Sequence, residues 1–437
     1  MKNVGKLFFR TALLLLIAGL ILGCFAAASY VWPGFLKSQL GFMAMRPLHV
    51  SAVLFWILIG ASACVYFGLN QLKPNELKSS MAYTQYALWL IAIVGMFYSY
   101  AVGDFGGREY WEFNPIWALP ITLAWIIFII QFLRITLQIK GWPVYMWMWL
   151  TGLVFFLFTF LEGYLWTIPY FRNALITDMT IQWKVNGSMV GAWNQIIYGT
   201  AMFLMDKISG KENTGKSKLA FAMYFLGFFN LCFNWGHHIY TLPALPYIRQ
   251  IGYVVSMTEW IFFLRIVWNW KNDLNEIRNH YSYFPYRFLM ASNFWVLLNL
   301  LLALFMSIPA FNLYSHGTHT TVAHAMGTTI GINTMILMAA AFMFLSSGPS
   351  IQSKENKAVN GLFWTLQISL LLFWISLIGS GIHKGLWQME QNRIPFAEMF
   401  EQLRPWFILF FVAGLGITLS LGGLAIHLLG NKRKNTF

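Results

Sequence analysis

The sequence predicts an all-α membrane protein, a single domain of twelve transmembrane helices that spans residues 1–437. Two features of composition support this fold class: hydrophobic residues make up 58% of the chain, and charged residues only 10%. A soluble globular domain carries about 25% charged residues. The third observation is that apolar stretches of about 20 residues, enough to cross a bilayer, recur along the whole chain.

Each predicted helix is one of these apolar stretches, and the loops between them are too short to form a soluble domain. In chain order the stretches cover residues 7–32, 47–70, 81–103, 115–138, 143–168, 181–205, 219–240, 250–270, 286–310, 318–346, 359–383 and 403–430. Successive spans cross the membrane in opposite directions, so each helix also receives a predicted direction.

Positive charge is distributed unevenly between the two sides of this predicted topology. With the N-terminus in the cytoplasm, the inner side collects most of the Lys and Arg residues. The outer side has only Lys37, Arg46, Arg108, Arg172, Arg249, Lys384, Arg393 and Arg404. Cytoplasmic loops carry an excess of Lys and Arg, so both termini are predicted to be cytoplasmic, in a bacterial inner membrane. Because the positive charge follows the membrane topology, the net charge of +14 is explained by a lipid bilayer as partner, and no nucleic-acid partner is predicted.

The first span has an alternative interpretation as a lipoprotein-type signal that ends at Cys24. Its removal would leave eleven spans and reverse the charge bias of every later loop. Cys24, Cys64 and Cys232 all fall within spans and have no metal-ligand spacing, so they are interpreted as small apolar core residues.

Five of the nine histidines lie near the predicted outer ends of spans: His49, His237, His238, His319 and His324. An imidazole within hydrocarbon is costly. A hydrogen-bonded core residue would explain any single histidine. Because the helices alternate in direction, their common depth is better explained by haem and metal centres held between helices.

Helical spacing adds geometry to these residues. Neighbouring residues of an α-helix differ by 100° around its axis, so His237 and His238 can both ligate one metal ion. His324 and Met326 differ by 200°, and their side chains can therefore reach two different haems. Imidazole and thioether are both ordinary axial ligands of haem iron. The alternative for Met326 is packing, because Met commonly fills gaps and the chain has 21 of them.

Three motifs carry a family resemblance: His-Gly-Thr-His-Thr-Thr-Val-Ala-His-Ala-Met at 316–326, Gly-His-His at 236–238 and Gly-Arg-Glu-Tyr-Trp-Glu at 107–112. They resemble subunit I of the haem-copper oxidase superfamily. Among its branches they are most similar to the large subunit of cytochrome-c-dependent nitric oxide reductases. The number of spans and the short loops extend the resemblance over essentially the whole chain.

The resemblance implies cofactor roles for the histidines. His49 and Met326 would be the axial ligands of a low-spin haem b, where the family has a histidine in place of the methionine. His324 would be the proximal ligand of a high-spin, b3-type haem. His237 and His238 would hold a non-haem metal that faces this haem, iron in the reductases and copper in the oxidases.

The resemblance also implies roles for three glutamates. Glu259 matches a glutamate beside the non-haem metal. Glu109 and Glu112 match acidic residues near a calcium ion that bridges haem propionates, and carboxylate oxygens suit such a hard cation. The alternative for these two residues is a solvated surface turn.

The span 181–205 departs from the family pattern. It should supply a third metal-binding histidine and, four residues later, a glutamate, but it offers Asn186 and Val190. A neutral carbonyl oxygen is a poorer ligand than imidazole. The predicted catalytic residues are therefore Asn186 and Glu259, and the metal set becomes His237, His238 and Glu259. Two histidines and a carboxylate suit iron(II) with open positions and are a poor copper set. Loss of the metal site is the alternative.

Proton and electron supply are expected from the outer side. The inner halves of the spans contain essentially no buried acids, whereas a proton pump needs an ionisable chain from the cytoplasm. Cys-x-x-Cys-His is absent, so any haem c must belong to a partner. The resemblance implies a membrane-anchored cytochrome c subunit, or a periplasmic cytochrome c, as the electron donor.

The predicted function is reduction of the small gas nitric oxide to nitrous oxide. One alternative is conversion of nitric oxide to nitrogen and oxygen, as in nitric oxide dismutases, whose metal site resembles the Asn186 and Val190 variant. Another is a non-catalytic haem protein of the membrane that senses gas or carries electrons.

Overall fold

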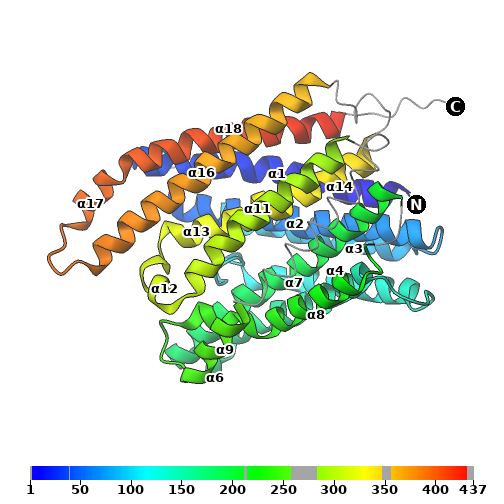
Figure 1. The fold of residues 1–437 in the computed structure, drawn as a ribbon, viewed down its shortest axis with the longest axis horizontal. Coiled ribbons are helices and arrows are strands. Elements are labelled where there is room, and N and C mark those ends of the chain that lie inside the picture. Colours follow the sequence, from blue (N-terminus) through cyan, green and yellow to red (C-terminus); the bar gives the residue numbers. More distant parts are fainter. Residues whose placement is uncertain (1, 39, 211–213, 257–282, 347–355, 431–437) are drawn as a thin grey trace. The chain divides into compact units, whose positions relative to one another are not determined.

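The computed structural model describes the whole chain except residues 1, 39, 211–213, 257–282, 347–355 and 431–437. Within this part of the chain most residues are helical (Figure 1), and the β-type pairing is one isolated antiparallel bridge between Phe105 and Phe113. The predicted all-α fold class is confirmed.

Ten helical segments of the described residues are long and apolar enough to cross a membrane. They correspond to ten of the twelve predicted spans. The predicted span 181–205 lies in α7 (Leu175–Ser209), a helix of 35 residues. The predicted span 250–270 starts in α9 (Pro246–Ser256), and its remainder lies outside the described residues. The protein is thus a multi-pass membrane protein.

The chain divides into two compact units. Unit 1 comprises Met1–Thr11 and Ile57–Tyr281, and unit 2 comprises Ala12–Trp56 and Ser282–Phe437. The helices α1 (Lys2–Val31) and α2 (Phe42–Leu72) each contribute to both units.

Unit 1 contains three helix pairings that matter for the site: α3 packs along α4, α5 along α7, and η3 against α7 and α9. Its further elements are α3 (Ser79–Ala101), η1 (Pro115–Trp117), α4 (Ala118–Thr136), α5 (Val144–Glu162), η2 (Leu165–Thr167), α6 (Pro169–Arg172), α7, α8 (Lys218–Phe233), η3 (Asn234–Ile239) and α9. Gly210 ends α7 in the left-handed conformation (φ 66°) that glycine adopts readily.

Unit 2 contains the long pair α16 and α18, which run side by side (Figure 1), with α13 packed against α16. Its further elements are α11 (Tyr283–Ser307), α12 (Pro309–Ser315), α13 (His319–Met326), η4 (Gly327–Thr334), α14 (Met335–Leu345), α16 (Lys357–Met389), α17 (Phe396–Gln402) and α18 (Arg404–Gly430). The segment η4 is a π-helix, so the predicted span 318–346 is helical throughout but changes its winding in the middle. Such wide turns are rare and occur frequently at functional sites.

The end of the predicted span 219–240 differs from a regular α-helix. The α-helix stops at Phe233, and the chain continues to Ile239 as the 3-10 segment η3. A close approach to α9 accompanies the tighter winding: a side chain at Gly236 would lie 2.7 Å from the carbonyl oxygen of Ile248. The predicted 100° between His237 and His238 therefore does not hold, since 3-10 residues are spaced about 120° apart.

Candidate haem and metal sites

His49 lies near the start of α2, in unit 2, and its ring is oriented by one hydrogen bond. Its Nδ1 atom is 2.7 Å from the carbonyl oxygen of Gly19 on α1. A carbonyl oxygen can only accept, so Nδ1 carries the proton and Nε2 keeps its lone pair. A histidine that ligates a metal or haem iron is held in this way. The geometry of His49 therefore fits an axial haem ligand.

Two glycines of α1, spaced four residues apart, make room for this arrangement. A side chain at Gly23 would lie 2.7 Å from Cε1 and 2.8 Å from Nδ1 of His49. A side chain at Gly19 would lie 2.6 Å from Cγ1 of Val53. Small residues at this spacing let membrane helices approach closely. The ring of His49 thus packs directly against the backbone of α1 at Gly23.

His324 and Met326 occupy the last turn of α13, also in unit 2. The side chain of Thr318 caps this helix by accepting a hydrogen bond from the backbone N–H of Thr320 at 3.2 Å. The segment is α-helical through both residues, so their predicted separation of 200° is retained. The Nδ1 atom of His324 is buried and makes no hydrogen bond within the described residues.

The sulfur of Met326 faces a hydroxyl group of the π-helix that follows. The Oγ1 atom of Thr329 is 4.0 Å from Sδ of Met326 and also donates to the carbonyl oxygen of Ala325 at 2.8 Å. Glycines again admit a neighbouring helix: side chains at Gly327 and Gly331 would overlap Asn299 and Trp295 of α11. The α13–η4 junction is therefore tightly packed.

His237 and His238 lie side by side in η3, within unit 1. Their ring centroids are 4.3 Å apart, and the ring planes are inclined by 32°. A side chain at Gly187 of α7 would lie 2.7 Å from Cδ2 and Nε2 of His238. The structure therefore brings the histidine pair to the turn of α7 that carries Asn186.

Asn186 is 8% exposed, and both ends of its amide are engaged by protein groups. Its Nδ2 donates to Oε2 of Glu109 at 2.9 Å, and its Oδ1 accepts from Nε2 of Gln182 at 3.1 Å. The carboxylate fixes this orientation because it can only accept. A metal ion would compete with Gln182 for the only amide atom that can ligate it.

The loop 107–112 presents Glu109 to Asn186 through a tight turn. A side chain at Gly107 would lie 1.4 Å from the carbonyl oxygen of Trp111, and Tyr110 has the positive φ of 75°. Burial raises the pKa of Tyr110, and the negative charges of Glu109 and Glu112 raise it further. The phenol between the two predicted calcium ligands is therefore neutral at physiological pH.

The described residues supply an incomplete metal set. Within them, no three His, Cys, Asp or Glu side chains come together in a group that could hold a metal ion. The pair His237–His238 offers two imidazoles, a chemistry that suits iron and other first-row metals. Glu259, the predicted third ligand, lies outside the described residues. The residues present fit a metal whose remaining ligands come from elsewhere.

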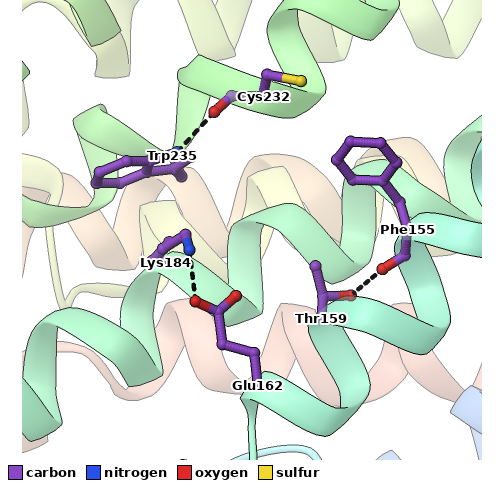
Figure 2. Close-up of polar contacts among 6 residues, drawn as sticks. All are labelled: Phe155, Thr159, Glu162, Lys184, Cys232 and Trp235. Atoms are coloured by element: carbon purple, nitrogen blue, oxygen red, sulfur yellow. Dashed lines mark hydrogen bonds and ion pairs between the residues drawn. The ribbon is translucent and has the colours of Figure 1, made fainter.

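An ion pair next to the histidine segment was missed by the sequence reasoning. Nζ of Lys184 on α7 is 2.5 Å from Oε1 of Glu162 on α5, and it also lies 5.8 Å from the ring centroid of Trp235 (Figure 2). The signal that could have found the pair was a charged residue inside each of two apolar spans, where ionisable side chains are costly and usually functional.

The chain is similar to known proteins over most of its length. The family model described as cytochrome c and quinol oxidase polypeptide I matches residues 3–416. A nitric oxide reductase subunit from Stutzerimonas stutzeri is 24% identical, over 96% of this chain and 93% of that protein. Cytochrome c oxidase subunit 1 of Rhodobacter capsulatus is 24% identical, over 93% and 81% respectively.

Two further similarities have lower identity. The cbb3-type cytochrome c oxidase subunit CcoN1 of Stutzerimonas stutzeri is 22% identical, over 91% of this chain and 88% of that protein. The cryo-EM structure of a heme-copper terminal oxidase dimer superposes with a TM-score of 0.74, at 14% identity, over 98% of this chain and 83% of that one. At that identity the structural likeness concerns the fold alone.

Proposed function

We propose that this chain, which belongs to the cytochrome c and quinol oxidase polypeptide I family, reduces nitric oxide to nitrous oxide. Membership of this haem-copper oxidase family makes it a haem-binding membrane oxidoreductase. The reaction combines two nitric oxide molecules, two electrons and two protons to give nitrous oxide and water. The expected electron donor is a periplasmic or membrane-anchored cytochrome c.

The donor set on unit 1 is the observation that carries this proposal. Two imidazoles lie side by side, while the amide of Asn186 is occupied by Glu109 and Gln182. Copper favours a fuller set of nitrogen ligands, whereas iron(II) accepts two histidines and a carboxylate with open positions. With Glu259 as the proposed carboxylate, such a site would suit the iron of a reductase better than the copper of an oxidase.

The chain's residues have distinct roles in the proposal. His49 and Met326 would hold the low-spin haem, and His324 would hold the high-spin haem. His237 and His238, with Glu259, would hold the non-haem iron. When bound, the haems and the iron would supply electron transfer and gas binding. Glu109 and Glu112 are proposed to hold calcium, with Glu109 also bonded to Asn186.

Metal analysis and gas turnover of the purified protein test the proposal together. We expect two haems and one non-haem iron per chain, with nitric oxide consumed and nitrous oxide formed when reduced cytochrome c is supplied. Turnover driven by quinol alone would contradict the periplasmic donor. Haem without non-haem metal, and no gas turnover, would leave a sensing or electron-carrying haem protein.

A second candidate is dismutation of two nitric oxide molecules to nitrogen and oxygen. It is favoured by one observation: the α7 turn that faces His238 carries the amide of Asn186 in place of an imidazole. Dismutation requires no net external electrons, and the geometry of His49, which fits a haem ligand, argues against it. Isotope-labelled gas analysis separates the two reactions by their products.

A further inference from the structure

The ion pair between Glu162 and Lys184 is placed where charge is costly. The two residues lie within the predicted spans 143–168 and 181–205, and their side chains are only 14% and 28% exposed. An ion pair that is largely removed from water gains little net stability, because desolvation offsets the attraction. Ionisable residues inside membrane spans usually serve function instead.

The pair is connected to the histidine segment by an aromatic ring. Nζ of Lys184 lies 5.8 Å from the ring centroid of Trp235, in the range of cation–π attraction. The indole is fixed in turn, since its Nε1 donates to the carbonyl oxygen of Cys232 at 2.8 Å (Figure 2). Lys184 therefore links α5, α7 and η3 at one point.

Both ends of this link are adjacent to the candidate metal site. Lys184 precedes Asn186 by two residues and Gly187, which contacts the ring of His238, by three. Trp235 precedes His237 by two residues in η3. The contact between Lys184 and Trp235 thus joins α7 to η3. A metal ion with ligands on α7 and on η3 would join the same two elements.

We propose that Lys184, anchored by Glu162 and covered by Trp235, positions the histidine pair for metal binding; this inference rests on the proposed function. With a histidine at position 186, the metal itself would tie α7 to η3. Here the amide of Asn186 is bonded to Glu109 and Gln182 instead. The contact between Lys184 and Trp235 then holds α7 against η3, as a metal-bound histidine at position 186 would. Lys184 is therefore a positioning residue.

The test measures metal affinity in the purified, haem-loaded full chain after removal of non-haem metal by a chelator. Iron(II) binding is followed by equilibrium dialysis, and the geometry of the site by electron paramagnetic resonance of the Cu(II)-loaded protein. Lys184→Met removes the charge and keeps much of the chain length. Lys184→Arg keeps both the charge and the stacking on Trp235. Asp178→Asn is the matched control, because Asp178 forms the ion pair with Arg108 (2.6 Å) in the same unit.

We expect Lys184→Met to weaken iron binding by about 10–100-fold, the range found when groups that position metal ligands are removed. It should also change the Cu(II) spectrum while the haem spectrum stays the same. Lys184→Arg should restore both readouts, and Asp178→Asn should alter neither. If Lys184→Met fails to fold, Trp235→Leu tests the same link from η3 and should weaken iron binding similarly.

Two results would overturn the inference, and they differ in meaning. If the native protein binds iron and Lys184→Met or Trp235→Leu binds it equally well, the positioning role is wrong and the proposed function stands. If the native protein contains haem but no iron or copper binds at the histidine pair, the proposed function fails and the positioning role fails with it.

Discussion

The rings of His49 in unit 2 and His238 in unit 1 are packed in the same way but have different polar neighbours. Each ring lies against the backbone of a glycine on a neighbouring helix, Gly23 for His49 and Gly187 for His238. The helix behind His49 also supplies the carbonyl group that orients its ring. The helix behind His238 offers Asn186 at the adjacent position, and its amide is bonded to other protein groups.

This difference distinguishes the surroundings of His49 in unit 2 from those of His238 in unit 1. In unit 2, one hydrogen bond fixes the tautomer and the orientation of the His49 ring, a geometry that fits the proposed haem ligand. In unit 1, the α7 turn next to His238 is joined to other protein groups by a hydrogen bond from Asn186 and an ion pair of Lys184. Haem binding and non-haem metal binding should therefore respond independently to substitution in the two units.

The largest expected effect comes from removing the imidazole of His49. His49→Leu should abolish binding of the low-spin haem, because leucine cannot ligate iron, and should leave the non-haem metal in place. Haem quantification by the pyridine haemochrome assay should show about half of the native haem. His383→Leu is the control, since the ring of His383 on α16 is hydrogen-bonded to the side chain of Gln402 (3.2 Å). Full haem content in His49→Leu would exclude His49 as the ligand.

A methyl group added at the glycine that contacts each histidine ring tests the comparison directly. Gly23→Ala places a carbon 2.7 Å from the ring of His49, and Gly187→Ala places one 2.7 Å from the ring of His238. Such overpacking costs about 1–3 kcal/mol if the ring cannot move away. Gly23→Ala should reduce low-spin haem and spare the metal, whereas Gly187→Ala should do the opposite.

The control for both glycine variants is Gly361→Ala, because nothing lies within 4 Å of the added carbon. It should preserve haem and metal content alike. Loss of both cofactors in Gly23→Ala and in Gly187→Ala would show that the two regions are coupled, and the comparison would break down.

An imidazole introduced at position 186 should raise the metal affinity of the candidate site in unit 1. Asn186→His should tighten iron binding by about tenfold or more, equivalent to at least about 1.4 kcal/mol, because imidazole binds first-row metals better than a carbonyl oxygen. Reductase activity should not rise in proportion, since Val190 leaves proton delivery without the carboxylate of the family pattern.

Thr180→His is the matched control for this substitution. It lies on the same helix but, six residues earlier, about 240° away around the axis. Dialysis against iron(II) should show unchanged affinity in this variant. If Asn186→His also leaves the affinity unchanged, position 186 does not face the metal.

The spans could be predicted because they depend on local composition. Apolar runs of about 20 residues give helices wherever backbone groups must be satisfied inside hydrocarbon. The ends of α18 (Arg404–Gly430) lie within one residue of the predicted 403–430. The 3-10 winding of η3 was not predictable, since it accompanies the close approach of Gly236 to α9, a contact between separate elements.

The candidate ligands could be named from the sequence because each carries its chemistry in its own side chain, and their roles remain predictions. The hydrogen-bond and ion-pair partners of these residues could not be predicted. The bond from Asn186 to Glu109 joins residues 77 positions apart, and the bond from Lys184 to Glu162 joins α7 to α5. Only the packing of helices decides such pairs. The carbonyl of Gly19 that orients His49 belongs to the same class.

The smallest expected effect concerns Met326, the proposed second ligand of the low-spin haem. If the thioether ligates the low-spin haem, Met326→His should lower its midpoint potential by on the order of 0.1 V, within the range that axial ligands cover. The six-coordinate absorption spectrum should persist. The fold permits the change, because Met326 is only partly buried and α13 ends there before the wider turns of η4. Met306→His on α11, in the same unit, is the control and should leave the potential at its native value. An unchanged potential and spectrum in Met326→His would show that the sulfur, 4.0 Å from Oγ1 of Thr329, serves packing alone.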